Sequence, residues 1–359
     1  MENFDFGKIM NEACEKVEKE TGRISILIAG KTGVGKSTLV NSIFQGNMAE
    51  TGQGKPVTKT TTEITKDGVP VSIYDTRGLE TKDYKETINE VKNFVSQRRN
   101  ETDVNRQIHV AWVCITEDSR RVEDAEIELV DMLAEYVPVI GIITKARADN
   151  GFQAEVKKLL PKARNVMRVR SIAETLDEGI TLPQMNLDKL VDLTEEVLPE
   201  GRRNAFAAAQ KASIKQKVSR AQAIIAGSVT AAIAAGATPI PFSDAAILVP
   251  IEVGMLAGIS KVFGLNLSKG LLGTLVSSML GASAATIGGK AIVSGLLKLI
   301  PGAGTVAGAV VSGTTAGTLT TTMGEIYVGT LTAVFNATKS EVPTTEQIVE
   351  EFNERLGKK

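Results

Sequence analysis

The segment GKTGVGKS at residues 30–37 combines the residue types that can hold a phosphate chain. Its glycines allow backbone N–H groups to close around a phosphate at the start of a helix. Lys36 adds a positive charge for the β- and γ-phosphates, and the hydroxyl of Ser37 is a suitable Mg²⁺ ligand. This spacing is the P-loop motif, which predicts a site for a nucleoside triphosphate and Mg²⁺. We expect phosphate contacts from Thr32, Gly33, Val34, Gly35, Lys36, Ser37 and Thr38.

A second motif, DTRG at residues 75–78, follows an apolar run and would complete such a site. Asp75 would hold Mg²⁺ through a water molecule, and the N–H of Gly78 would meet the γ-phosphate. Between the two motifs lies a polar, threonine-rich segment at residues 52–64. A threonine there could ligate Mg²⁺ only while the γ-phosphate is present, which is how a switch loop becomes ordered. The order of these elements predicts a nucleotide-dependent switch.

The elements that must position these motifs alternate between strands and helices. Five apolar runs rich in β-branched residues are candidate buried strands, and they lie at 23–30, 69–75, 107–115, 137–144 and 163–171. Helical segments lie between them, for example residues 122–136, with Ile127, Val130 and Ala134 on one face. This alternation predicts a doubly wound, mostly parallel sheet with its ligand at the carboxyl ends of the strands.

These motifs together resemble a known class of proteins. The segments GKTGVGKSTLVNSIF, PVT, DTRGLE and ITKA are similar to the Era- and septin-like branch of the translation-factor-class GTPases. The segment HVAWVCITEDSRRVEDAE resembles a bacterial subset of that branch, in which a hydrophobic domain of unknown function follows the GTPase domain. Residues 239–264 look like the characteristic segment of that second domain. The resemblance covers about residues 23–335.

The resemblance implies binding of GTP and GDP and hydrolysis of GTP with Mg²⁺. Thr58 of PVT best matches the switch threonine, a Mg²⁺ ligand with a catalytic role beside Lys36; Thr60 and Thr61 are the alternatives. Leu79 stands where the best-known small GTPases have a glutamine that orients water, so we expect slow intrinsic hydrolysis unless a partner supplies that group. Pairing of GTPase domains in septin-like proteins implies a homodimer.

The sequence leaves two possibilities for recognition of the base. In the [NT]KxD element of the family, the lysine stem stacks on the base and the aspartate accepts hydrogen bonds from the guanine edge. Thr144 and Lys145 match this element, but Arg147 occupies the aspartate position and presents only donors. Either a longer loop brings Asp149 into the pocket, or the site is less selective. A nucleotide-binding scaffold without hydrolysis and an ATPase are the alternative functions.

The segment RSIAE at residues 170–174 resembles the last base-contacting element of the family. In that element the backbone meets the guanine O6 atom. Ser171 and Ile172, with the alanine that follows them, would make this contact here. We therefore include both residues in the predicted nucleotide site.

Composition divides the chain near residue 200. Residues 201–359 carry 14 Lys/Arg and 8 Asp/Glu, whereas residues 1–200 carry 27 and 34. The net charge of −1 and the pI near 6.1 make nucleic acid an unexpected partner. We predict an N-terminal helix at 1–22, a GTPase domain at 23–200, a basic helix plus a hydrophobic all-α domain at 201–338, and a C-terminal amphipathic helix at 339–359.

The hydrophobic domain has two interpretations. Uncharged runs at 221–243, 270–289 and 299–324 are long enough to cross a membrane. The GxxxG spacings at 304–308 and 313–317 let helices approach closely, either in lipid or in a soluble bundle.

The charged residues in and beside these runs support different interpretations. The segment at 201–220 has six Lys/Arg and no acid, which suits an anionic membrane surface. Asp244, Glu252 and Glu325 favour the soluble bundle instead, because charge is costly in lipid. Both interpretations stay open from the sequence.

Several isolated residues bear on location and structure. Cys14 and Cys114 lack Cys or His neighbours at metal-binding spacing, so we expect reduced thiols. The charged N-terminus is not typical of a signal peptide. We therefore predict a cytoplasmic protein, with peripheral or integral membrane association through residues 201–338. His109, the only histidine, is predicted to be a satisfied core residue. Thr344 and Gln347 fit a capping box at the start of the C-terminal helix.

Overall fold

The computed structural model describes residues 5–48, 53–76, 79, 84–177, 179–236, 244–280, 313–339 and 341–356. The chain forms two compact units. The α/β unit comprises Gly22–Ser213, and the helical unit combines Met1–Thr21 with Ile214–Lys359. Each unit is described by itself below.

The α/β unit is built around a seven-stranded sheet with the strand order β2-β3-β4-β1-β5-β6-β7. The strands are β1 (Ile24–Ala29), β2 (Gln53–Pro56), β3 (Thr61–Lys66), β4 (Val69–Thr76), β5 (Val110–Thr116), β6 (Val139–Thr144) and β7 (Asn165–Arg168). β1 pairs in parallel with β4 and β5, and β6 pairs in parallel with β5 and β7. At one edge, β3 pairs antiparallel with β2 and β4. The predicted mostly parallel sheet is confirmed.

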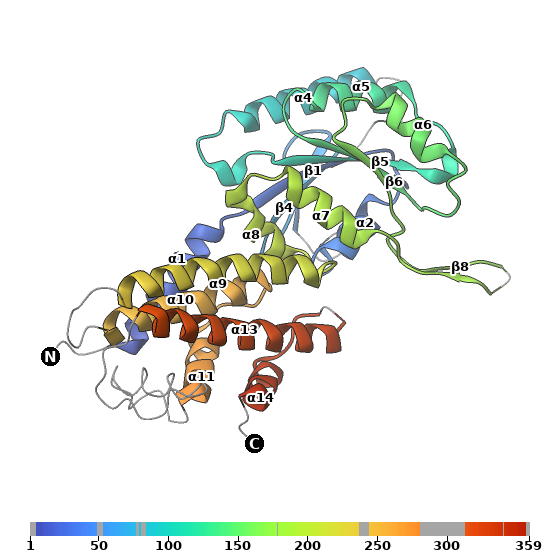
Figure 1. The fold of residues 1–359 in the computed structure, drawn as a ribbon. Helices are drawn as coiled ribbons and strands as arrows, with labels where there is room; N and C mark the ends of the chain where they lie inside the picture. The colour runs from blue at the N-terminus through green and yellow to red at the C-terminus, as the bar shows by residue number, and fades with distance from the viewer. Residues whose placement is uncertain are drawn as a thin grey trace. The chain divides into compact units, whose positions relative to one another are not determined.

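Helices cover both faces of the sheet (Figure 1). One face is packed by α2 (Lys36–Ile43), α7 (Leu187–Val197) and α8 (Glu200–Ala209). The other is packed by α4 (Tyr84–Arg99), α5 (Asp124–Leu133) and α6 (Phe152–Leu159). All six residues of β1 are buried, as expected for a strand between two helical layers. The short elements are η1 (Val104–Arg106), η2 (Glu117–Ser119) and the hairpin of β8 (Glu174–Thr175) and β9 (Thr181–Leu182).

Part of the threonine-rich segment lies in the sheet as β3, where the sequence predicts a switch loop. Its threonines and isoleucine are β-branched, which suits a pleated strand, and Thr62 lies opposite Asp75 of β4. A turn precedes the strand, and the Thr58 hydroxyl closes it by accepting from the N–H groups of Thr60 at 3.2 Å and Thr61 at 3.0 Å. The loop proper is therefore shorter than the sequence indicates.

Two buried residues, His109 just before β5 and Cys114 within it, lack the ionisation state that proton transfer or nucleophilic attack would need. His109 is 8% exposed, and its Nδ1 accepts from the N–H of Ser25 at 3.0 Å. Burial lowers the pKa of His109 to about 4, and the positive charge of Arg202 acts in the same direction. The predicted core histidine is thus a neutral one. Burial raises the pKa of the Cys114 thiol to about 12, so it is protonated.

The helical unit contains α1 (Phe6–Thr21), α9 (Ile214–Gly236), α10 (Asp244–Val262), α11 (Lys269–Leu280), α13 (Gly313–Ala337) and α14 (Thr345–Arg355). α9 and α13 lie side by side in close contact (Figure 1). A Cβ added at Gly317 would lie 2.8 Å from Cγ1 of Ile233, and one at Gly324 would lie 2.6 Å from Cγ1 of Ile225. The GxxxG spacing at 313–317 therefore serves helix packing inside this unit, whereas residues 304–308 lie outside the described part.

The two terminal helices pack into the same hydrophobic core. On α1, Phe6 and Met10 are buried, and Ile9, Cys14 and Val17 are partly buried against the core. On α14, Ile348 and Phe352 are buried. The predicted capping box is present, because Gln347 N–H donates to the Thr344 hydroxyl at 3.3 Å and Thr344 N–H donates to Gln347 Oε1 at 2.9 Å.

The basic segment at 201–220 is not one helix. It belongs first to α8, whose Phe206 packs edge-on against Phe44 with ring centroids 6.2 Å apart, and then to α9. Arg202 donates to Asn105 Oδ1 at 2.9 Å, and Lys217 is 1% exposed with its Nζ donating to the Val262 carbonyl at 3.1 Å. Arg203 also donates, to the Leu198 carbonyl at 3.3 Å, so at least three of the six basic side chains serve internal contacts. This packing also places residues 201–213 with the sheet, where the sequence pattern places them with the hydrophobic domain.

The acidic residue Glu252 is buried in the helical core. It is 3% exposed, and its Oε1 accepts from the Thr320 hydroxyl at 2.6 Å. Its Oε2 has no hydrogen-bond partner among the described residues. Burial raises the pKa of Glu252 to about 7, although the Thr320 hydrogen bond opposes this rise.

We predict that Glu252 makes the helical unit less stable as the pH rises. The folded state holds the proton more tightly than the unfolded state, so stability is lost between about pH 4.5 and pH 7 as the carboxyl ionises. Glu252→Gln should remove this loss and raise the free energy of unfolding by about 2–3 kcal/mol at pH 8. Denaturant unfolding across this pH range is the measurement. The exposed Glu325→Gln is the control and should keep the wild-type slope; equal slopes in all three proteins would contradict the prediction.

Candidate nucleotide-binding site

The predicted P-loop connects β1 to α2 at the carboxyl end of the sheet. Gly30 has φ 144°, and a Cβ there would lie 2.4 Å from the Cys114 carbonyl oxygen, so the close approach to β5 requires glycine. Gly35 has φ 99° and immediately precedes α2, whose first residue is Lys36. The motif therefore has the strand and helix that a phosphate-binding loop needs.

The Lys36 ammonium lies inside this loop. Its Nζ donates to the carbonyls of Gly30 at 2.7 Å and Lys31 at 3.0 Å, and the residue is 9% exposed. Ser37 is exposed and Thr38 is half-buried in the first turn of α2. The loop thus presents a positive charge, a hydroxyl and a helix N-terminus together, which is the chemistry that binds phosphates.

Asp75 lies beside the P-loop because β4 pairs with β1, with Ile28 opposite Asp75 in the register. The rest of DTRG is only partly visible, since Arg77 and Gly78 lie outside the described residues. Leu79 is 3% exposed and packs in the core between the sheet and helices α4 and α5. Leu79 therefore contributes to packing, and its side chain has no polar group that could orient a water molecule.

The described residues contain no group of three or more His, Cys, Asp or Glu arranged to hold a metal. The donors that the sequence assigns to Mg²⁺ are the Ser37 and Thr58 hydroxyls and the Asp75 carboxylate, all oxygens of the kind that a hard cation prefers. Ser37 and Asp75 fit this role beside the loop. Thr58 fits it less directly, because its hydroxyl already accepts the two backbone hydrogen bonds of its turn.

Thr144 connects the P-loop to the segment predicted to bind the base. Its Oγ1 lies 2.6 Å from the Val34 carbonyl and 3.2 Å from the Ile115 carbonyl, both of which can accept its proton. Thr144 is the last residue of β6, so Lys145 follows directly, exposed and with φ 54°. The first residue of the predicted base element thus has a structural role.

A cavity of about 340 Å³ lies next to these residues. It is lined by Gly35, Thr38, Asp118, Thr144, Lys145, Arg147, Arg170, Ser171, Ile172, Ala173 and Glu174. The cavity brings together the predicted P-loop end, the 144–145 segment and the 171–173 segment. The Ser171 carbonyl is fixed by the Ser42 hydroxyl and the Gln184 amide, each at 2.8 Å.

Asp149 does not line this cavity. Its Oδ1 accepts from the N–H of Gln153 at 2.8 Å, at the start of α6, and lies 3.6 Å from Arg168 Nε. The longer loop considered from the sequence therefore directs Asp149 to a helix N-terminus in this structure. Acidic residues that the sequence analysis missed, Asp118 and Glu174, line the cavity instead.

Glu117 organises the loop at 145–149 and was also missed. It is 2% exposed and accepts from the backbone N–H groups of Arg147 at 2.6 Å and Ala148 at 2.9 Å, and from Arg168 Nε at 2.5 Å. Burial raises the pKa of Glu117, but the hydrogen bonds from Arg168 and the backbone outweigh burial, so the pKa lies below its usual value. The only sequence signal was an acid two residues after the end of a predicted buried strand.

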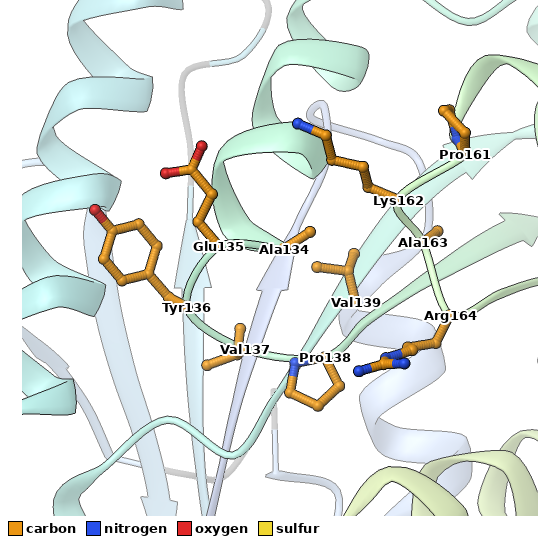
Figure 2. Close-up of a pocket in the computed structure, with 10 residues that line it drawn as sticks. All are labelled: Ala134, Glu135, Tyr136, Val137, Pro138, Val139, Pro161, Lys162, Ala163 and Arg164. Atoms are coloured by element: carbon orange, nitrogen blue, oxygen red, sulfur yellow. The ribbon is translucent and has the colours of Figure 1, made fainter.

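A second cavity, of about 580 Å³, lies elsewhere on the α/β unit (Figure 2). It is lined by residues 134–139 and 161–164, which precede or begin β6 and β7. The P-loop follows the carboxyl end of β1, and β1, β5, β6 and β7 run in the same direction. The cavity therefore lies at the amino ends of these strands, opposite the P-loop. It is separate from the candidate nucleotide site.

Comparison with known families agrees with this geometry. Residues 25–145 match the family described as 50S ribosome-binding GTPase, and residues 202–357 match a domain of unknown function, DUF697. The second match confirms the predicted domain of unknown function after the GTPase domain.

Relatives share parts of the chain. Magnetosome membrane protein 22 of Magnetospirillum gryphiswaldense is 34% identical over 108 residues, which cover 30% of this chain and 55% of that protein. Septin-1 of Rattus norvegicus is 25% identical over 203 residues, which cover 50% of this chain and 53% of the septin. Translocase of chloroplast 101 of Physcomitrium patens is 43% identical over 70 residues, which cover 19% of this chain and 8% of that protein. The chain spans about half the length of the first two relatives.

The septin-like part of the resemblance has support in these relatives, while the assignment to an Era-like class stays a prediction. The sheet, the P-loop geometry and the family match agree with one another. The chain therefore carries a GTP-binding, P-loop GTPase-family domain followed by a helical domain of unknown function.

Proposed function

We propose that the protein is a Mg²⁺-dependent switch that binds and hydrolyses GTP, and that its nucleotide state controls the helical unit on a membrane or a partner. The observation that carries the proposal is the P-loop with Lys36 inside it, joined through Thr144 to the adjoining cavity. Phosphates would bind at residues 32–38, and the base would enter the cavity beside Lys145. Ser37 and Asp75 would hold Mg²⁺, with Thr58 joining them only after its turn opens.

Control of the helical unit requires a physical connection from the P-loop. α2 begins at Lys36 and ends at Ile43, whose carbonyl accepts from the N–H of Lys211 at 2.8 Å. The N–H of Gln45 donates to the Ala209 carbonyl at 3.0 Å, so the chain is tied to the end of α2 just before α9 begins. A displacement of α2 on nucleotide binding would be transmitted to the start of the helical unit by these bonds.

A nucleotide-binding scaffold without turnover is the second candidate. It is favoured by Leu79, whose side chain is buried in the core and cannot orient water. Under the main proposal a partner or a second copy supplies the missing group. The pairing of GTPase domains that the septin-like resemblance implies is the form that this second copy would take.

We predict that the protein binds GTP and GDP more tightly than ATP and ADP, and that Lys36→Ala abolishes this binding. Removing the ammonium takes away the positive charge that the phosphates need. Binding should be measured by calorimetry with the four nucleotides in the presence of Mg²⁺. Lys66→Ala is the matched control, because Lys66 Nζ also donates to a loop carbonyl, that of Gly46, at 2.5 Å but away from the site.

The same proteins separate the two candidate functions. Phosphate release over many turnovers that is lost in Lys36→Ala and Ser37→Ala would exclude the scaffold. If the protein binds GTP tightly but releases no phosphate, both at low protein concentration and at a high concentration that favours dimers, the hydrolytic switch is excluded. Absence of guanine-nucleotide binding in the wild-type protein would rule out both.

Membrane association of the helical unit is supported by α9. Among the helices that the structure describes, α9 is the one with the length and mean hydropathy of a membrane span, and little of its apolar window is buried. Its outer face carries small residues such as Ala226, Gly227 and Ala234. The magnetosome relative, whose name describes a membrane protein, agrees with this interpretation. We propose association with a membrane surface that depends on the bound nucleotide.

We predict that the full chain floats with anionic liposomes in one nucleotide state and that Ala226→Asp prevents this. The new carboxylate would lie on the exposed face of α9, where burial in lipid is unfavourable. Flotation should be measured with GDP and with a non-hydrolysable GTP analogue. Ala154→Asp, at an exposed position of α6, is the control and should float as the wild type does. A wild-type protein that stays at the bottom in both states would refute the proposal.

A further inference from the structure

We propose that Asp118 is the residue that reads the guanine base, in place of the family aspartate whose position Arg147 occupies. This inference rests on the proposed function, because it assigns the specificity of the same nucleotide site. It replaces the role that the sequence gives to Asp149.

The guanine edge defines what the reading group must be. Its N1–H and N2–H₂ groups are two neighbouring donors, which a carboxylate can accept with both of its oxygens. Arg147 has only donors and cannot accept from them. A carboxylate must therefore come from another residue close to Lys145, and it must have oxygens that are not already occupied.

Four carboxylates surround the 145–149 loop, and three are engaged. Glu117 is buried and accepts from two backbone N–H groups and from Arg168. Asp149 accepts from the N–H of Gln153 and faces Arg168. Glu174 receives the fork of Arg147, with Nε 2.8 Å from Oε2 and Nη2 in contact with Oε1. A fork of this kind occupies the face of the carboxylate that would meet two base donors.

Asp118 is the remaining carboxylate. It lines the cavity, and its side chain is 46% exposed. No group among the described residues donates a hydrogen bond to its carboxylate, and its ion-pair partner, Arg147 Nη1, lies 3.9 Å from Oδ1. Thr116 of β5 is paired with Thr144 of β6, so Asp118 leaves its strand beside the start of the base element.

Arg147 holds this arrangement together. It uses Nε and Nη2 on Glu174 and Nη1 on Asp118, so one guanidinium lies between both acidic side chains. This keeps the donors of Arg147 directed at protein carboxylates and its positive charge close to Asp118. Arg147 thus acts as a positioning residue, and the Glu174 pair fixes its orientation.

The test exchanges the base together with the side chain. Xanthine carries a carbonyl where guanine carries its 2-amino group, so an amide that can donate should prefer XTP. We expect Asp118→Asn to lose about 100-fold in affinity for GTP and to gain affinity for XTP, because the guanine donors lose their acceptor. Asp118→Ala should lose GTP affinity without the gain for XTP. Calorimetry with the full chain, GTP, XTP and Mg²⁺ is the measurement.

Matched variants decide between the four carboxylates. Asp149→Asn and Glu174→Gln make the same chemical change: the first should keep the wild-type ratio of GTP to XTP affinity, and the second, which only loosens the hold on Arg147, should not switch the preference to XTP. Arg147→Met should lower that ratio, and Arg147→Lys, which keeps the charge, should restore part of it. A switch to XTP in either of the first two variants, with none in Asp118→Asn, would overturn the assignment while leaving GTP binding in place. Loss of all nucleotide binding by the wild-type protein would instead reject the proposed function.

Discussion

The hydroxyl of Thr144 is the point on which the geometry of the α/β unit depends. It lies within hydrogen-bond distance of the Val34 carbonyl in the P-loop and of the Ile115 carbonyl in β5, while Thr144 itself ends β6. Because parallel strands bring their carboxyl ends to one edge of the sheet, a single buried side chain can join three segments there. The phosphate-binding loop and the predicted base element are thus held in one frame by the sheet.

Electrostatic balance determines what this frame can bind. The loop after β6 depends on an ionised carboxylate, since Glu117 accepts two of its backbone N–H groups from a buried position. Arg168 and Arg147 neutralise the acids that gather around it. An arginine at position 147 is therefore part of a charge network, and its presence does not by itself exclude guanine. What it changes is which acid is left to face the cavity.

The sequence predicts the parts of this fold that depend on local pattern. The five predicted strands, the P-loop between a strand and a helix, and the Thr344 capping box all follow from short-range periodicity and spacing, and they are present, although β7 is only partly buried. The antiparallel strands β2 and β3 were not predicted, because a polar, threonine-rich segment becomes a pair of strands only when β3 pairs with β4 and β2 pairs with β3. Asp118 and Glu117 were missed for the same reason, since their roles depend on the pairing of β5 with β6. The placement of α8 depends on Phe206 meeting Phe44, a contact that no local pattern encodes.

The same long-range pairing bears on the proposed control of the helical unit by the nucleotide. Helix α2 begins at Lys36 in the P-loop. Its C-terminal end is joined to residues 209–211 by two backbone hydrogen bonds, so a rigid helix connects the P-loop to this segment. Coupling through such an element needs two discrete arrangements and not gradual deformation, because packed cores are bistable. The turn closed by Thr58 provides one candidate for the first step, since its hydroxyl cannot both accept the N–H groups of Thr60 and Thr61 with its present geometry and turn toward a metal ion. A switch built in this way would convert the presence of one phosphate group into a change at residue 214, where the helical unit begins.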